Sequence, residues 1–211
     1  MKKYFVLATV MLLAGCAIAP QSQTPTAVYD FGLQRSSSTS QPRLRASLLV
    51  TEAVSPAGLD SPAIQYRLAY HDIAQSHVYA NSRWAATPGA LLTQRIRSHL
   101  AAVTSDGVVS TSDGARSDYA LRLELEEFTQ VFDTPDKSRV VIRLRASLVE
   151  RHSRALLAQQ GFNLERPAPT ANAAGAVHAL AETSDELAGN LIAWLATRLE
   201  EEGKKKPVKK S

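Results

Sequence analysis

Hydrophobic and polar residues alternate most regularly in the middle of the chain. Tyr and Leu alternate with Ala, Arg and Glu over residues 119–125, and a second alternating run covers residues 140–148. Such alternation predicts strands that place one face on a core and the other in water. The turn-forming segment 134–137 separates the two runs, so we expect a long hairpin. The alternation slips at residues 126–128, which indicates a β-bulge.

Shorter apolar runs predict further strands on both sides of this hairpin. They are rich in apolar, β-branched or aromatic residues and are bounded by turn-forming residues. The predicted strands cover residues 28–33, 44–52, 63–70, 77–80, 108–110 and 156–164. The last of them follows the hairpin directly, so we expect it to pair as a third antiparallel strand.

Two segments have the periodicity of amphipathic helices. The first, residues 88–104, opens with Thr87 before Pro88 and continues with apolar residues at helical spacing. The second lies within residues 171–201, where Glu182-Thr183-Ser184 predicts a kink or a restart and Gly203 an end. The order of elements predicts an α+β fold with a single domain. We expect a mostly antiparallel sheet with the two amphipathic helices packed on one face.

The first fifteen residues have the pattern of an export signal. A basic start precedes an apolar stretch that is too short to span a bilayer, and Leu13-Ala14-Gly15-Cys16 ends it. This ending resembles the lipobox of bacterial lipoproteins, which implies removal of residues 1–15 and covalent lipid, such as palmitate, on Cys16. The alternative is a buried free cysteine after an uncleaved helix. The position of Cys16 at the end of the signal favours lipidation.

The residue after the cysteine carries information about the membrane. Ala17 stands where an aspartate retains lipoproteins at the inner membrane of well-studied bacteria. By that resemblance we expect an anchor in the outer membrane, with the protein on the periplasmic side.

Polar segments flank the predicted domain, which covers residues 28–201. Residues 16–27, rich in Pro, Gln, Ser and Thr, predict a tether, and residues 202–211 predict a disordered tail. The tail contains Lys204, Lys205, Lys206, Lys209 and Lys210. It is either a solvated end or a contact for anionic lipid head groups, worth about 1 kcal/mol per lysine near a membrane surface.

Charge and cysteine content exclude several classes of protein. The chain has 211 residues and a formal net charge of +4, but seven of its 24 basic residues are the tail lysines and Lys2 and Lys3. The remaining 17 basic residues stand against 20 acidic ones, so the body carries about −3. We therefore expect no binding to nucleic acid. A single cysteine allows no intramolecular disulfide and no cysteine metal cluster.

The sequence contains none of the common catalytic motifs. There is no Gly-x-Ser-x-Gly elbow, Walker A motif, Gly-x-Gly-x-x-Gly or His-Glu-x-x-His. His71, Asp72 and His77 lack the spacing of metal ligands and are interpreted as polar loop residues. We expect no enzyme, no metal site and no cofactor other than the lipid on Cys16.

Two carboxylates in the central hairpin invite a catalytic interpretation. A strand places Glu124 and Glu126 on one face, and the opposite strand offers Arg143 and Arg145. Cross-strand ion pairing explains these carboxylates better than acid–base catalysis.

Several segments stand in a characteristic order along the mature chain. They are Tyr29-Asp30-Phe31-Gly32, residues 59–67 (LDSPAIQYR), 79–84 (YANSRW), 126–133 (EEFTQVFD), 145–148 (RASL), 167–169 (PAP) and 173–176 (AAGA). Together they resemble the ABC-type transport auxiliary lipoproteins, the family of PqiC/YmbA-like proteins. The resemblance covers about residues 16–199 and leaves out the lysine tail.

This resemblance implies a non-catalytic auxiliary subunit of an Mce-type ABC transport system for lipids or other hydrophobic molecules. Its partners would be an Mce-domain substrate-binding protein, an ABC permease and an ATPase, each a separate chain, and a homo-oligomer is compatible with it. Arg83 and Trp84 are the candidate partner contact, although a core position of Trp84 is slightly favoured because tryptophan is usually buried. The alternative function is a freestanding envelope chaperone or assembly factor that binds lipid or protein in a groove between sheet and helices.

Overall fold

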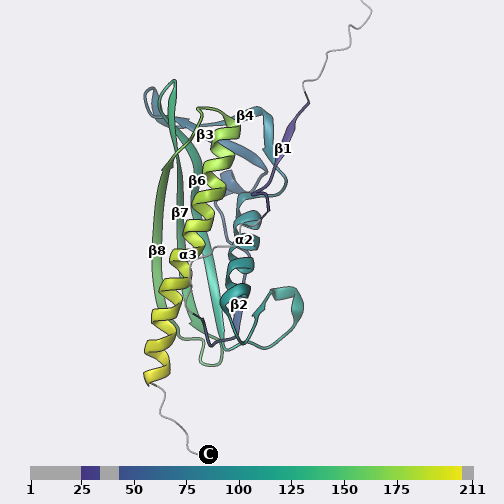
Figure 1. Cartoon of the computed structure of the whole chain (residues 1–211), viewed down its shortest axis with the longest axis vertical. Coiled ribbons are helices and arrows are strands. Elements are labelled where there is room, and N and C mark those ends of the chain that lie inside the picture. The colour runs from purple at the N-terminus through teal and green to yellow at the C-terminus, as the bar shows by residue number, and fades with distance from the viewer. Residues whose placement is uncertain (1–24, 34–42, 206–211) are drawn as a thin grey trace, which may run out of the picture.

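A computed structural model describes residues 25–33 and 43–205 of the chain (Figure 1). Cys16, Lys206, Lys209, Lys210 and most of the predicted tether lie outside the described residues. The strands are β1 (Ala27–Tyr29), β2 (Leu48–Val50), β3 (Ala63–Leu68), β4 (Asp72–Trp84), β5 (Val108–Val109), β6 (Tyr119–Thr134), β7 (Lys137–Glu150) and β8 (Leu156–Pro167). The helices are α2 (Pro88–Val103) and α3 (Ala173–Lys205), with short 3-10 turns at Ala57–Leu59 and Thr111–Asp113. This is the predicted α+β fold.

The sheet has eight strands and mixed pairing, with β6 at its centre. One edge of β6 pairs with β2 near its start and with β3 near its end, and the other edge pairs with β7. The long pairings β3–β4, β6–β7 and β7–β8 are antiparallel, as predicted. The parallel pairings, β1–β4, β2–β5, β2–β6 and β3–β6, are each two or three residues long.

The central hairpin confirms the alternation read from the sequence. Leu121, Leu123 and Leu125 of β6 are buried, and the residues between them are exposed or face the other side of the sheet. The register shifts between Leu125 and Glu127, which is the predicted bulge. After the bulge, Phe128 points to the same core face as Leu125.

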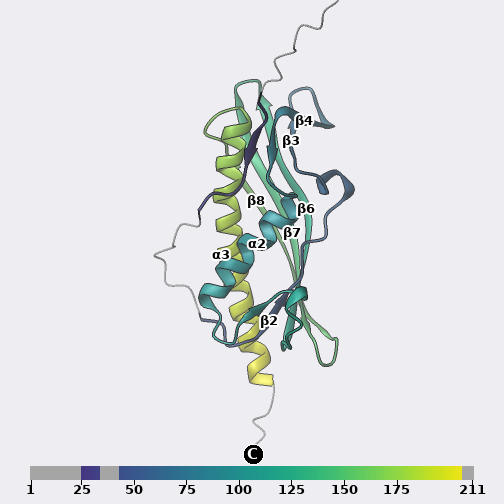
Figure 2. The ribbon, with the colours of Figure 1, turned by 90° about the vertical axis from the view of Figure 1, so that its right-hand side faces the viewer.

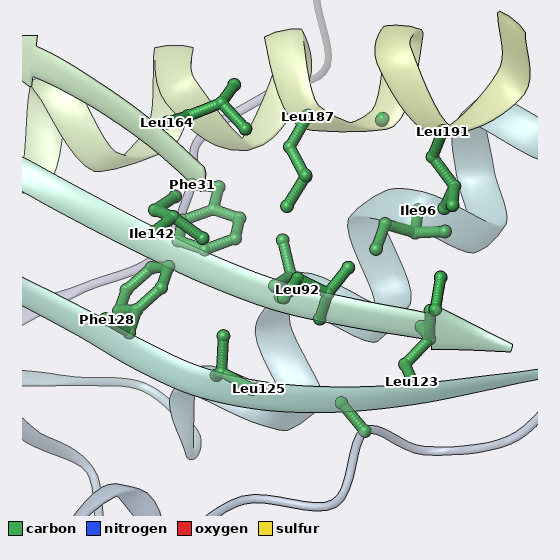
Figure 3. Packing of buried hydrophobic residues seen from close by; sticks show 14 of the residues in the cluster. Phe31, Leu92, Ile96, Leu123, Leu125, Phe128, Ile142, Leu164, Leu187 and Leu191 are labelled. Carbon is green, nitrogen blue, oxygen red and sulfur yellow. The ribbon is translucent and has the colours of Figure 1, made fainter. Parts of the chain in front are cut away.

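Both helices pack on one face of the sheet, as Figures 1 and 2 show. Thr87 caps α2, because its hydroxyl accepts a hydrogen bond from the Ala90 backbone N–H at 3.3 Å. In Figure 3, Leu92 and Ile96 of α2 and Leu187 and Leu191 of α3 point toward the strands and fill the layer between them. Each such buried side chain contributes about 1.5–3 kcal/mol to folding.

Strand β4 is longer than the sequence predicts. It begins at Asp72, so the interpretation of Asp72 and His77 as loop residues is wrong, and only His71 lies in a turn. The strand predicted over residues 77–80 is confirmed as part of β4. Tyr66 of β3 pairs with His77, and their rings stack at 5.1 Å. Residues 72–76 are all exposed, so this part of the strand lacks the apolar alternation from which a strand is predicted.

Helix α3 continues beyond the predicted end. It runs as one helix from Ala173 to Lys205, so the predicted break near Thr183 is absent and Gly203 does not terminate it. The hydroxyls of Thr183 and Ser184 donate to the carbonyls of Ala179 and Leu180, each at 2.7 Å, which lets both residues stay helical. Gly203 lacks the positive φ that ends a helix at glycine. The predicted disordered tail therefore starts too early, since residues 202–205 are helical.

Candidate functional site

The two residues predicted to contact a partner have different environments. Trp84 is 1% exposed and packs edge-on against Phe31 and Phe128, at ring distances of 5.6 and 5.8 Å. It is a core residue, as the favoured interpretation holds. Arg83, its neighbour on β4, is exposed. Only Arg83 of this pair presents its side chain at the surface.

Residues 30–33, which follow β1, form a strap across the helix pair. Gly32 adopts φ +64, and its N–H donates to Asp30 Oδ1 at 2.7 Å, so the chain turns sharply here. The turn directs Phe31 inward, where it is 9% exposed, and leaves Leu33 95% exposed. Phe31 thus anchors the start of the domain to the aromatic core beside Trp84.

A partly buried network of polar side chains joins the strap to both helices. Asp185 Oδ1 of α3 lies 2.8 Å from Arg95 Nε as an ion pair, and it shares a hydrogen bond of 2.9 Å with His99 Nε2; Arg95 and His99 are both on α2. Arg95 also donates from Nη2 to the Phe31 carbonyl at 2.8 Å, and its guanidinium carbon lies 5.9 Å from the Phe31 ring centre. Arg95 and His99 are both buried. One carboxylate on α3 therefore holds α2, and through Arg95 it holds the strap.

Cavities open on both sides of the strap. The larger, of about 550 Å³, lies between the strap and α3, with Val177, Ala181 and Ala174 as its apolar wall. Arg95, Asp185, Glu182 and His178 give the same cavity a charged side. A second cavity of about 240 Å³ lies between the strap and α2. These cavities border the outer surface of the helix pair, whereas leucine and phenylalanine side chains fill the layer between sheet and helices.

The charged groups around the larger cavity are committed to structural contacts. Glu182 and Glu186 of α3 pair with Arg166 of β8, at 3.6 and 2.7 Å. His178 lies 3.8 Å from Glu182. No group of three or more His, Cys, Asp or Glu residues with metal-binding geometry occurs in residues 25–33 and 43–205. The cavity can receive a small apolar group beside a polar one. The charged side chains around it connect β8 and α2 to α3 through ion pairs.

The open face of the sheet carries the charges predicted to pair across the hairpin. Arg145 lies opposite Glu124 and contacts both Glu124, at 3.4 Å, and Glu126. Glu127 pairs instead with Arg67 of β3, at 3.4 Å. These side chains are partly or largely exposed, so each pair contributes about 0–1 kcal/mol. Cross-strand pairing is confirmed for Arg145.

An aromatic cluster covers the far end of β3, β4 and β6. The Tyr66 ring lies 4.8 Å from Tyr79 and 5.7 Å from Phe132. Tyr79 donates its hydroxyl proton to Gln130 Oε1 at 2.6 Å, inside a partly buried setting. Burial, with a smaller effect of Tyr66, raises the pKa of Tyr79 to about 12. The phenol therefore stays neutral at every physiological pH.

Sequence reasoning missed Arg95, His99 and Asp185 as a unit. The signal available was a polar pair four residues apart on the apolar stripe of α2. Among the lysines considered as a contact for anionic lipid, Lys204 is exposed at the end of α3. Cys16 and the lysines from Lys206 onward fall outside the described part of the chain. No helix among the described residues is long and apolar enough to cross a membrane.

Comparisons with known proteins give a family and a fold. The family model of the ABC-type transport auxiliary lipoprotein component matches residues 29–191. No curated protein matches the chain. A solved structure from Xanthomonas campestris, described as a DUF330 protein, has a TM-score of 0.73 at 19% identity and covers 84% of this chain and 99% of its own. A second, described only as uncharacterised, has a TM-score of 0.60 at 19% identity and covers 81% and 99%. The TM-scores establish a shared fold, and at identities this low they establish the fold alone.

Proposed function

Because this chain belongs to the ABC-type transport auxiliary lipoprotein component family, we propose that it is the lipid-anchored, non-catalytic subunit of an Mce-type ABC transport system. The observation that carries the proposal is the family match over residues 29–191, which takes in β2–β8, α2 and most of α3. The transported molecules in this proposal are lipids or other hydrophobic compounds.

The proposed anchor is covalent lipid on Cys16, in the outer membrane and facing the periplasm. The lipobox-like ending at Cys16 supports lipidation, and Ala17 supports the outer membrane. Each buried lipid methylene contributes about 0.8 kcal/mol, so several acyl chains give a stable anchor. Eight residues lie between Cys16 and Pro25, and a fully extended chain from one to the other spans about 30 Å. The domain would therefore stay close to the membrane surface.

The proposed partners are an Mce-domain substrate-binding protein, an ABC permease and an ATPase, each a separate chain. The lack of a Walker A motif in this sequence supports a separate ATPase. The ion pairs around the strap support a structural role for the charged residues there. A homo-oligomer of the domain is part of the same proposal, and light scattering of the detergent-solubilised protein measures it.

A second candidate is a freestanding envelope chaperone or assembly factor. The cavity of about 550 Å³ beside the strap, with its apolar wall on α3, favours this alternative. It lies outside the layer between sheet and helices, where we expected such a groove. Native mass spectrometry of the protein purified from membranes separates the two candidates, because a lipid chaperone would carry bound lipid in addition to its anchor.

Affinity purification from crosslinked envelopes tests the proposed function. The tagged wild-type protein is compared with Cys16→Ala, and captured proteins are identified by mass spectrometry. We expect an Mce-domain protein with its permease and ATPase, and loss of all three with Cys16→Ala. Capture of unrelated envelope proteins alone would contradict the transport role and favour the chaperone.

Membrane fractionation tests the anchor separately. Labelled palmitate should enter the wild-type protein and not Cys16→Ala, and the labelled protein should sediment with outer-membrane markers. Sedimentation with the inner membrane would overturn the proposed location and leave the partner question open to the purification.

A further inference from the structure

A polar cavity of about 850 Å³ opens at the end of the sheet where β6 begins and β7 ends. Three arginines line it: Arg45 before β2, Arg116 before β6, and Arg151 after β7. We call these three residues and the cavity between them the arginine basin. Residues far apart in sequence thus bring guanidinium groups to one place.

The arginines of the basin lack acidic partners. Within the described part of the chain, neither Arg45 nor Arg116 makes a side-chain hydrogen bond or an ion pair with another residue. Arg151 donates only to the Ser117 hydroxyl, at 3.1 Å. Arg95 and Arg145 are paired with carboxylates. Some other exposed arginines also lack an ion pair within the described residues, so the basin differs from them in bringing three arginines to one cavity.

Two carboxylates, Asp118 and Glu150, line the same cavity, and each already accepts a hydrogen bond from a serine. Asp118 Oδ2 accepts from the Ser47 hydroxyl at 2.7 Å, and Glu150 Oε2 accepts from the Ser153 hydroxyl at 2.5 Å. A guanidinium group offers several N–H donors in a fixed plane and binds a carboxylate through two parallel hydrogen bonds. Arg45 and Arg116 are exposed and keep all of these donors for a ligand.

The basin lies at the end of the molecule opposite the start of the domain. Figures 1 and 2 show β1 at one end of the long axis and the β7–β8 connection with the last turn of α3 at the other. The predicted tether joins the domain at β1. The basin therefore lies at the end of the domain that is far from the attachment of the tether. This location favours a partner protein over the head groups of the anchoring membrane.

From these observations we infer that the arginine basin binds an acidic segment, rich in Asp or Glu, of a partner protein. The inference deepens the proposed function, because it assigns a docking site to one of the partner subunits. The chemistry of the site rests on Arg45, Arg116 and Arg151 alone. It remains testable if the partner is a protein outside any transport system.

A peptide-binding assay on the full mature chain in detergent tests the inference. The probe is a fluorescein-labelled octaglutamate peptide, followed by fluorescence anisotropy at low and high salt. Because the lysine tail would attract the same peptide, all variants are made in a chain whose Lys204, Lys205, Lys206, Lys209 and Lys210 are replaced by Gln. The basin variant is Arg45→Gln/Arg116→Gln.

The matched control removes the same charge elsewhere. Arg122 and Arg143 are exposed on the open sheet face and have no ion pair within the described residues, so Arg122→Gln/Arg143→Gln is the control variant. We expect the basin variant to bind about tenfold more weakly, the change that corresponds to about 1.4 kcal/mol, and the control to bind within about twofold of the parent. High salt should weaken peptide binding by the parent more than peptide binding by the basin variant, because salt screens exposed charges.

Three results would overturn the inference. They are an equal loss in the control variant, no saturable binding by the parent, and binding of inorganic pyrophosphate at the basin without binding of octaglutamate, which would assign a phosphate ligand. Thermal midpoints of both variants verify that they fold. The assay contains no transport proteins, so its failure and that of the envelope purification are independent.

Discussion

Replacing Asp185 by Ala tests the account of the helix pair most sharply. The substitution leaves Arg95, whose side chain is 8% exposed, without its carboxylate and removes the His99 contact. Loss of one partner from a fully buried ion pair costs about 3–5 kcal/mol. The Asp185 side chain is 31% exposed, and water can partly replace the carboxylate. We therefore expect a loss of about 2–3 kcal/mol.

Urea unfolding followed by circular dichroism measures this loss. For a domain of this size, 2–3 kcal/mol corresponds to a fall in Tm of roughly 4–12 °C. Glu201→Gln is the matched control, because its ion pair with Arg198 at 2.8 Å is exposed and should contribute less than about 0.5 kcal/mol. Equal effects of Asp185→Ala and Glu201→Gln would refute the idea that this network holds the helices together.

The strap provides a second measurement on the same network. Arg95→Met removes the hydrogen bond to the Phe31 carbonyl but keeps an apolar side chain in contact with the core. Hydrogen exchange at residues 30–33 should become faster in this variant while exchange in the β6–β7 hairpin stays unchanged. Unchanged exchange in the strap would show that Phe31 packing holds it without Arg95.

Three further predictions concern single positions. Trp84→Ala should lower stability by about 3–5 kcal/mol in urea unfolding, because it empties a core site; a loss below about 1 kcal/mol would contradict its core position. Gly175→Ala should lower Tm, since a Cβ there would clash with the Thr170 carbonyl, whereas Gly203→Ala, with nothing within 4 Å, should stabilise α3 by up to about 1 kcal/mol. The pKa of Tyr79 is about 12 in the folded protein against an ordinary value of 10.0. Because the unfolded chain ionises first, the contribution of Tyr79 to the free energy of unfolding is full below pH 10 and is lost between pH 10 and 12. Phenolate absorbance should show one tyrosine titrating late in the wild type and none in Tyr79→Phe; an unchanged titration curve would contradict the burial of this phenol.

Local patterns were sufficient for much of the fold. The β6–β7 hairpin and its bulge follow from alternation in adjacent segments, because each residue's side depends on its immediate neighbours. Helix α2 is predicted to within one residue because Thr87 and Pro88 mark its start. The burial of Trp84 was also the favoured interpretation. These features depend on contacts that are short in sequence or on strong residue preferences.

Features that depend on distant contacts could not be predicted. Residues 72–76 of β4 are exposed, and pairing with β3 alone makes them a strand. His99 and Asp185 lie 86 positions apart, and only the crossing of α2 over α3 brings them together. The same holds for the arginine basin, whose members come from three separate connections. Alternation and periodicity carry no information on contacts between residues that are far apart in the sequence.

The central claim is that the chain is a subunit of an ABC transport system, and reciprocal purification tests it most directly. The ATPase of the candidate system is tagged, the assembly is solubilised in mild detergent, and this lipoprotein is quantified against the permease by mass spectrometry. We expect the lipoprotein to co-purify at a constant ratio to the permease and to stay with it through size-exclusion chromatography. Recovery of ATPase, permease and Mce protein without this chain, although it is present in the solubilised membranes, would contradict the account.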